Sequence, residues 1–97
     1  SGLPRINANT FWESNAYEAE RIGANIREGL HSQSKAEFLA KLQISIKEAN
    51  ETLYWLELLY ETDYITKEMY NSIYPECVEL AKLLTSIIKT TKANHKL

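Results

Sequence analysis

Apolar residues recur every three or four positions through most of the chain, which is the spacing that lines up one face of an α-helix. The first such series contains Trp12, Ala16, Ala19, Ile22 or Gly23, Ile26 and Leu30. Asn9 or Thr10 can cap this helix, because either side chain can accept a hydrogen bond from a free amide of the first turn. Gly29 can end it, since glycine readily adopts the left-handed conformation common just past a helix end. The pattern therefore predicts a helix over residues 10–29 after a lead-in over residues 1–9.

The second series is longer and broader than the first. Ser34, followed three residues later by Glu37, forms a capping box in which each side chain can bond the other residue's amide. The apolar face then runs through Phe38, Leu39, Leu42, Ser45, Ile46, Ala49, Leu53, Leu56 and Tyr60. A face this wide predicts contact with two or more neighbouring helices. The helix is expected over residues 34–62, with Thr62 and Asp63 at its end.

A third series predicts a helix over residues 66–92 that opens at Thr66. Its apolar positions are Met69, Ile73, Cys77, Leu80, Leu84 and Ile87. Pro75 interrupts the series, because proline lacks the amide that would bond the carbonyl of Asn71 and its ring crowds that turn. A kink or a short break is therefore expected near residues 71–74.

Short connections between long helices make neighbouring helices antiparallel. We therefore predict an all-α, antiparallel up-down bundle of three long helices in a single domain over residues 1–97. The side chains expected in its core are Ile26, Phe38, Leu42, Ala49, Leu53, Leu56, Ile73, Cys77, Leu80 and Leu84. An apolar content of 44% and a charged content of 25% are typical of a folded chain rather than a disordered one.

Charge and composition narrow the classes of partner. The net charge of −2 argues against electrostatic binding of nucleic acid by the protein surface as a whole, because such binding usually needs a basic surface. No apolar run approaches the roughly 20 residues that span a bilayer, so no membrane partner is expected. Cys77 is the single cysteine, which excludes an intramolecular disulfide and fits a reducing, cytoplasmic location.

Glu28 and His31 have the spacing of half a di-iron site, but such bundles need two of these pairs and two further glutamates. Gly29 breaks the helix between them, and the second histidine, His95, lies near the C-terminal end of the chain. We therefore interpret His31 as a solvated loop residue. Neither a metal nor another cofactor is predicted.

Glu48 and Glu51 lie three residues apart on one helix face, where two carboxylates could do acid–base chemistry. The favoured interpretation is a polar network that joins them to Asn25 and Glu28 across the first helix–loop–helix corner. Cys77 lies on an apolar stripe, where burial raises the pKa of a thiol and makes it inert. The sequence thus predicts a protein without catalytic residues.

Several segments together resemble a known family. They are Ile22–Gly29, Ser34–Phe38, Lys47–Thr52, Tyr54–Leu59 and Ser86–Lys92. From about residue 22 to about residue 92 the chain resembles the four-helix-bundle proteins encoded by intervening sequences in bacterial 23S rRNA genes. Accessory proteins of diversity-generating retroelements are related to that family. The resemblance implies a bacterial, non-enzymatic bundle that self-associates.

Residues 3–21 depart from the family pattern and leave too little chain for the family's first helix, which indicates an engineered, truncated or divergent member. A missing helix should leave an apolar groove. The residues expected at this interface are Leu39, Ile46, Leu83, Ile87 and Trp12. A second copy should cover the groove in a homodimer or a higher homo-oligomer. The alternative is that residues 3–8 fold back over it.

Three functions follow from these observations. The leading one is a non-enzymatic scaffold or oligomerisation module. The second is an engineered bundle built on this family with no natural function. The third is a nucleic-acid-binding accessory protein of a retroelement or an rRNA intervening sequence, for which Lys89, Lys92 and Lys96 form a small basic patch.

Overall fold

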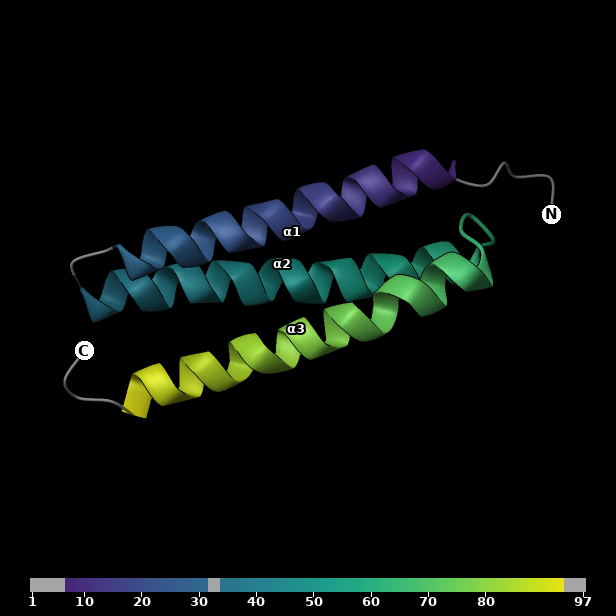
Figure 1. The fold of residues 1–97 in the computed structure, drawn as a ribbon. Coiled ribbons are helices and arrows are strands. Elements are labelled where there is room, and N and C mark those ends of the chain that lie inside the picture. Colours follow the sequence, from purple (N-terminus) through teal and green to yellow (C-terminus); the bar gives the residue numbers. More distant parts are fainter. Residues whose placement is uncertain (1–6, 32–33, 94–97) are drawn as a thin grey trace.

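The computed structural model describes residues 7–31 and 34–93, which form three α-helices. They are α1 (Ala8–Leu30), α2 (Lys35–Glu61) and α3 (Lys67–Ala93). α2 lies between α1 and α3 and runs antiparallel to both (Figure 1). The molecule is correspondingly elongated, 56 × 19 × 16 Å. The predicted all-α up-down bundle is confirmed. No helix of the described part is both long and apolar enough to cross a membrane.

Side-chain caps fix where the helices begin. Ser34 Oγ accepts a hydrogen bond from the Glu37 amide at 3.1 Å, and Thr66 Oγ1 accepts one from the Met69 amide at the same distance. Both caps match the predicted starts. α1 differs, because Asn7 is its cap and accepts from the Asn9 amide at 2.8 Å, so the helix begins two residues earlier than predicted. Of the predicted lead-in over residues 1–9, residues 1–6 lie outside the described range.

The turn between α2 and α3 is tight and internally bonded. Asp63 has a φ of 65°, a left-handed conformation that aspartate tolerates better than most residues. The Tyr64 and Ile65 amides both donate to the carbonyl of Leu59, at 2.8 and 3.4 Å. This directs the Ile65 side chain into the core, where it is only 1% exposed. The predicted end of the second helix at Thr62 and Asp63 agrees with this turn.

A break at residues 71–74, one of the two expected outcomes, does not occur, because α3 continues through Pro75 as one helix (Figure 1). The other expected outcome, a kink at this position, stays a prediction. Proline removes only one amide from the ladder of helical hydrogen bonds. Pro75 and Asn71 are both exposed, so water can reach the carbonyl that loses its partner.

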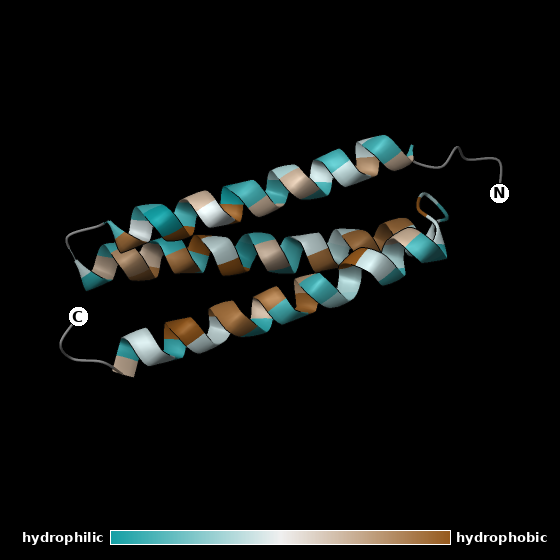
Figure 2. Ribbon diagram, viewed as in Figure 1, coloured by the Kyte–Doolittle hydropathy of each residue, from teal (hydrophilic) through white to brown (hydrophobic). Residues whose placement is uncertain are grey.

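The core consists of two clusters joined along α2. One contains Phe11, Leu56, Ile65 and Met69, next to the α2–α3 turn, and the other contains Ile22, Leu42, Ala49 and Leu84. Strongly hydrophobic residues are concentrated on α2 and α3, whereas α1 is mostly hydrophilic or intermediate (Figure 2). Of the predicted core, Leu42, Ala49, Leu56 and Leu84 are buried. The remaining six are half-buried, because helices cover α2 on two sides only.

The start of α1 holds a core residue that the sequence pattern did not indicate, and one prediction about α1 needs correction. Phe11 packs with Leu56, Ile65 and Met69, whereas Trp12 beside it is 42% exposed. Gly29 does not have a positive φ, and α1 continues to Leu30 with His31 as its cap. A β-carbon on Gly29 would lie 2.7 Å from Phe38 Cδ1 and 3.3 Å from Lys41 Cβ. Glycine is therefore required by the close approach of α1 to α2, not by a turn.

Candidate interaction surface

α1 and α3 each pack along α2 but hardly approach one another. The space between them is an open groove whose floor is α2, and we call it the α1–α3 groove. Its volume is about 130 Å³. Among the residues that line it are Ala19, Ile22, Ala49, Ile73, Cys77 and Leu80. In a four-helix bundle this is the position of the fourth helix, diagonally opposite α2.

The apolar stripe predicted on the first helix borders this groove. Residues three, four, seven or eleven positions from Ala19 share its face of the helix. They are Trp12, Ala16, Gly23, Ile26 and Leu30. Trp12 is 42% exposed and Leu30 is 67% exposed. The predicted series is therefore divided, because Ile22 and Ile26 pack in the second core cluster with α2, whereas Trp12 and Leu30 are exposed.

α3 supplies the other edge of the groove. Leu83 and Ile87 lie three and seven residues beyond Leu80, on the same side of the helix. Leu83 is 56% exposed, whereas Ile87 is half-buried against the second core cluster. By their positions on the helices, Trp12, Leu83 and Ile87 lie beside this groove, but they are not among the residues that line it.

The other two predicted interface residues lie elsewhere. Ile46 is half-buried and packs against the cluster of Leu42 and Leu84, between α2 and α3. Leu39, seven residues earlier, shares that side of α2. These two residues fill the seam between neighbouring helices and do not border the same groove as Leu83 and Ile87.

The predicted corner network forms in part. Asn25 Nδ2 donates to Glu48 Oε1 at 3.4 Å, and Arg21 Nη2 donates to the same oxygen at 3.3 Å. The Glu48 side chain is 13% exposed, and its other oxygen, Oε2, is buried without a partner in the described part of the chain. Arg21 was missed, although its place one turn before Asn25 puts both side chains on the same side of α1.

The two remaining members of the predicted network are not part of it. Glu28 pairs with Lys41 Nζ at 2.7 Å, and this hydrogen bond and charge lower the pKa of the Glu28 carboxyl. Glu51 is exposed at the rim of a second groove, between α1 and α2. Glu48 lines the same groove, but it is bonded to Arg21 and Asn25, and no hydrogen bond joins it to Glu51 in the described part of the chain.

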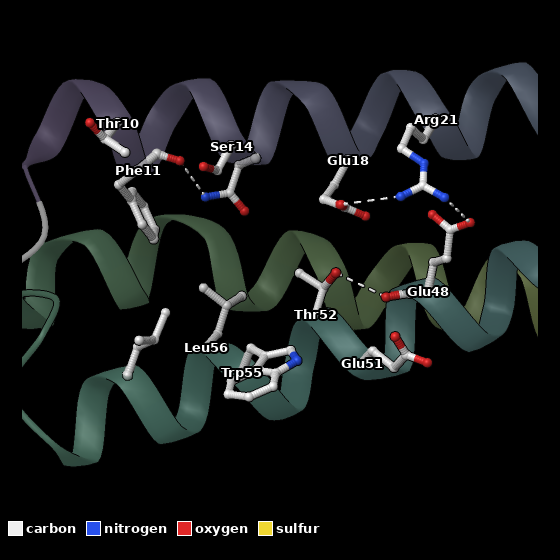
Figure 3. Close-up of a pocket in the computed structure, with 12 residues that line it drawn as sticks. Thr10, Phe11, Ser14, Glu18, Arg21, Glu48, Glu51, Thr52, Trp55 and Leu56 are labelled. Carbon is white, nitrogen blue, oxygen red and sulfur yellow. Dashed lines mark hydrogen bonds and ion pairs between the residues drawn. The ribbon is translucent and has the colours of Figure 1, made fainter.

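The groove between α1 and α2 is larger, about 470 Å³, and has an apolar half and a polar half (Figure 3). Phe11, Trp55 and Leu56 line the apolar half. In the polar half Arg21 lies between Glu18 and Glu48, at 3.9 and 3.3 Å. Arg21 thus pairs with two of the three carboxylates that line the groove, and Glu51 lies exposed at its rim. Across residues 7–31 and 34–93, no three histidine, cysteine or acidic side chains are arranged to hold a metal ion.

The aromatic residues near the second turn form a stacked column. The rings of Tyr60, Tyr70 and Tyr74 follow one another at centroid distances of 4.5 and 4.7 Å. The Tyr74 hydroxyl donates to Glu57 Oε1 at 2.7 Å, and this bond raises the pKa of Tyr74 to about 12. Burial raises the pKa of Tyr70 as well. These contacts hold α2 and α3 together beside the turn.

Cys77 is half-buried in the wall of the α1–α3 groove. Burial, with a smaller contribution from Glu76, raises the pKa of its thiol. This agrees with the prediction that the thiol is unactivated. His31 is exposed at the cap of α1, and His95 lies outside the described residues.

Three antiparallel helices with an open groove between α1 and α3 define an all-α helical bundle. The chain belongs to the family of 23S rRNA-intervening sequence proteins, whose model matches residues 18–86. The resemblance expected from about residue 22 is thus confirmed. It begins one turn earlier and ends somewhat sooner than predicted.

A crystal structure from Bacteroides thetaiotaomicron VPI-5482 is similar to the chain, with 57% sequence identity and a TM-score of 0.69. The match covers 75% of this chain and 68% of that one, which is described as a protein of unknown function from the S23 ribosomal protein family. No curated protein matches the chain. Neither match bears on the expected relation to retroelement accessory proteins or on an engineered origin of residues 3–21.

Proposed function

We propose that this protein is a non-catalytic helical module that self-associates through the α1–α3 groove. One observation carries the proposal: apolar side chains of all three helices line an open groove, among them Ala19, Ile22 and Leu80. Trp12, Leu30 and Leu83, on the two helices that border it, are left 42–67% exposed. Soluble monomers rarely keep contiguous apolar patches of this kind in contact with water. Covering the groove with another helix would complete a four-helix arrangement.

The energetics favour covering the groove. Complete burial of a large apolar side chain contributes about 1.5–3 kcal/mol, and three such residues are available on each copy. The polar residues nearby do not oppose it. Glu48 already bonds Arg21 and Asn25 on the α2 side of α1, so its partners stay in place when the groove is filled.

A catalytic function finds no support among the described side chains. Glu28 is held by Lys41, Glu48 by Arg21, and the Cys77 thiol is protonated because burial raises its pKa. Acid–base and nucleophilic catalysis both need a group whose protonation state is poised for the reaction. None of these three groups meets that need.

The thiol of Cys77 provides the test of the proposal, because it lies in the groove wall. As the protein concentration rises and a second copy covers the groove, the rate at which the Cys77 thiol reacts with a thiol reagent should fall. A cysteine at Tyr17 in a Cys77→Ser background is the control, since Tyr17 is exposed on the other side of α1. A Cys77 rate that does not change with protein concentration would contradict self-association through this groove.

A second candidate function is binding of nucleic acid by α3. Lys82 and Lys89 lie on one side of α3 and line a shallow depression with Thr85 and Ser86, donors that suit phosphate oxygens. Lys92, the second residue of the predicted basic patch, follows one turn after Lys89, whereas Lys96 lies outside the described residues. Anisotropy of a labelled single-stranded RNA should then fall steeply with salt. No binding at low salt would exclude this function.

A further inference from the structure

We propose that the groove between α1 and α2, which we call the α1–α2 groove, binds a small organic cation: an amine or a guanidine carried on an aromatic or branched aliphatic body. The α1–α2 groove adjoins the α1–α3 groove, and Asn15, Glu18 and Thr52 line both. The inference does not depend on the proposed self-association, because it concerns a ligand of the single chain.

The α1–α2 groove has the size and the apolar wall of a small-molecule site. Its volume of about 470 Å³ lies within the range of about 300–1,000 Å³ that is usual for ligand pockets. Its apolar half consists of Phe11, Leu56, Leu59 and Trp55, and Trp55 is 56% exposed (Figure 3). An apolar body that fills this half leaves water and covers the indole ring, which favours binding.

The polar half of the groove presents mainly hydrogen-bond acceptors, because several of its donors are already engaged. The Thr52 hydroxyl donates to the carbonyl of Glu48 at 2.9 Å. The side-chain amide of Asn15 donates to the carbonyl of Phe11, also at 2.9 Å. The guanidinium of Arg21 pairs with the Glu48 carboxylate. Carboxylate and hydroxyl oxygens therefore remain for a ligand, and they accept hydrogen bonds from its N–H groups.

Charge makes a cation the preferred donor. The charged groups that line the groove are three carboxylates and one guanidinium, which leave a net charge of −2 at neutral pH; they belong to Glu18, Glu48, Glu51 and Arg21. Oε2 of Glu48 is buried without a partner in the described part of the chain, so only the other oxygen of this carboxylate is paired. A buried acceptor without a partner costs free energy, and a positive group nearby lowers that cost.

Glu51 and Trp55 indicate where the cation lies. They are four residues apart on α2, so their side chains are neighbours on one side of the helix, about 6 Å apart along its axis. An ammonium group between them can pair with the carboxylate and lie over the indole ring, since a cation–π contact needs about 6 Å or less to the ring centre. The apolar body then extends along α2 toward Leu56 and Leu59.

The fluorescence of single-tryptophan variants tests the inference, with 2-phenylethylamine as the probe. Trp12→Phe leaves Trp55 as the only tryptophan, and Trp55→Phe leaves Trp12. As the probe is added, the emission of Trp55 should change saturably with a Kd of about 1 mM, the affinity expected for a ligand of so few atoms. The emission of Trp12, which does not line the α1–α2 groove, should change little.

Matched ligands and variants isolate the role of charge. The alcohol 2-phenylethanol keeps the ring without the cation, so in the Trp12→Phe protein it should bind about tenfold more weakly than the amine, the combined effect of an ion pair and a cation–π contact. Glu51→Gln should weaken binding of the amine by about two- to fivefold. Glu20→Gln is the control, because it removes a charge of α1 that does not line the groove.

Three results would overturn the inference. An emission of Trp55 that shows no saturable change would contradict the site as a whole. Equal affinities for the amine and the alcohol would contradict recognition of a cation. Equal weakening by Glu51→Gln and Glu20→Gln would contradict the position assigned to the ammonium group. None of these results bears on self-association, which is measured separately by the reactivity of Cys77.

Discussion

Gly29 in α1 faces the ring of Phe38 in α2 so closely that a β-carbon on Gly29 would lie 2.7 Å from Cδ1 of that ring. Gly29→Val should therefore destabilise the fold by about 1–3 kcal/mol, the usual cost of forcing extra atoms into a packed site. Urea denaturation measures the change. Gly23→Ala is the control, and at a concentration where the protein is monomeric it should be neutral or stabilise by about 0.4–1 kcal/mol. Equal effects of the two substitutions would show that the α1–α2 contact is not this close.

Leu83 and Leu84 are adjacent in α3 and differ completely in burial. Leu84 is 0% exposed and belongs to the second core cluster, so Leu84→Ala should cost about 2–5 kcal/mol of the free energy of unfolding. Leu83→Ala should leave the stability of the monomer nearly unchanged and weaken self-association instead. Chemical denaturation at two protein concentrations distinguishes these effects. A large loss in the monomer from Leu83→Ala would mean that α3 is rotated relative to this structure.

Tyr74 should give the fold a dependence on alkaline pH. Its hydrogen bond to Glu57 raises the pKa of Tyr74 from 10.0 to about 12, so the folded state holds the proton more tightly than the unfolded chain. The resulting stabilisation is complete below pH 10 and is lost as the pH rises toward 12. Tyr74→Phe keeps the ring but has no hydroxyl to titrate, so its loss of stability over this interval should be smaller. In the Tyr74→Phe variant, a spectrophotometric titration should also lack the tyrosine ionisation that occurs at the highest pH in the wild type. Identical pH profiles for the two proteins would contradict the Tyr74–Glu57 contact.

Helix starts could be predicted because they depend on neighbours in sequence. The hydroxyls of Ser34 and Thr66 bond amides three residues away, and no tertiary contact is needed to place them. The core residue at the start of α1 could not be predicted in the same way. Phe11 and Trp12 are adjacent aromatic residues, and periodicity alone does not say which neighbour each apolar face will meet. Phe11, which has no partner in the predicted series, was therefore missed as a core residue.

Long-range contacts account for the other differences. Gly29 stands near a helix end, where local rules favour a left-handed cap, but its actual constraint is Phe38 on the next helix. Arg21 joins Glu48 across 27 residues of sequence, a pairing that no local pattern contains. The candidate surface was predicted in part for the same reason. Trp12 and Leu83 could be identified as surplus apolar residues and are exposed, whereas Ile46 and Ile87 are half-buried against the second core cluster.

Sedimentation equilibrium of the full chain tests the central claim, self-association through the α1–α3 groove, most directly. The mass should rise from that of a single chain, 11.2 kDa, toward twice that value as the concentration increases. Ala19→Arg should hold the protein at the monomer mass, and Tyr17→Arg should leave the equilibrium unchanged. A wild-type mass of 11.2 kDa at every concentration up to hundreds of micromolar would contradict the account.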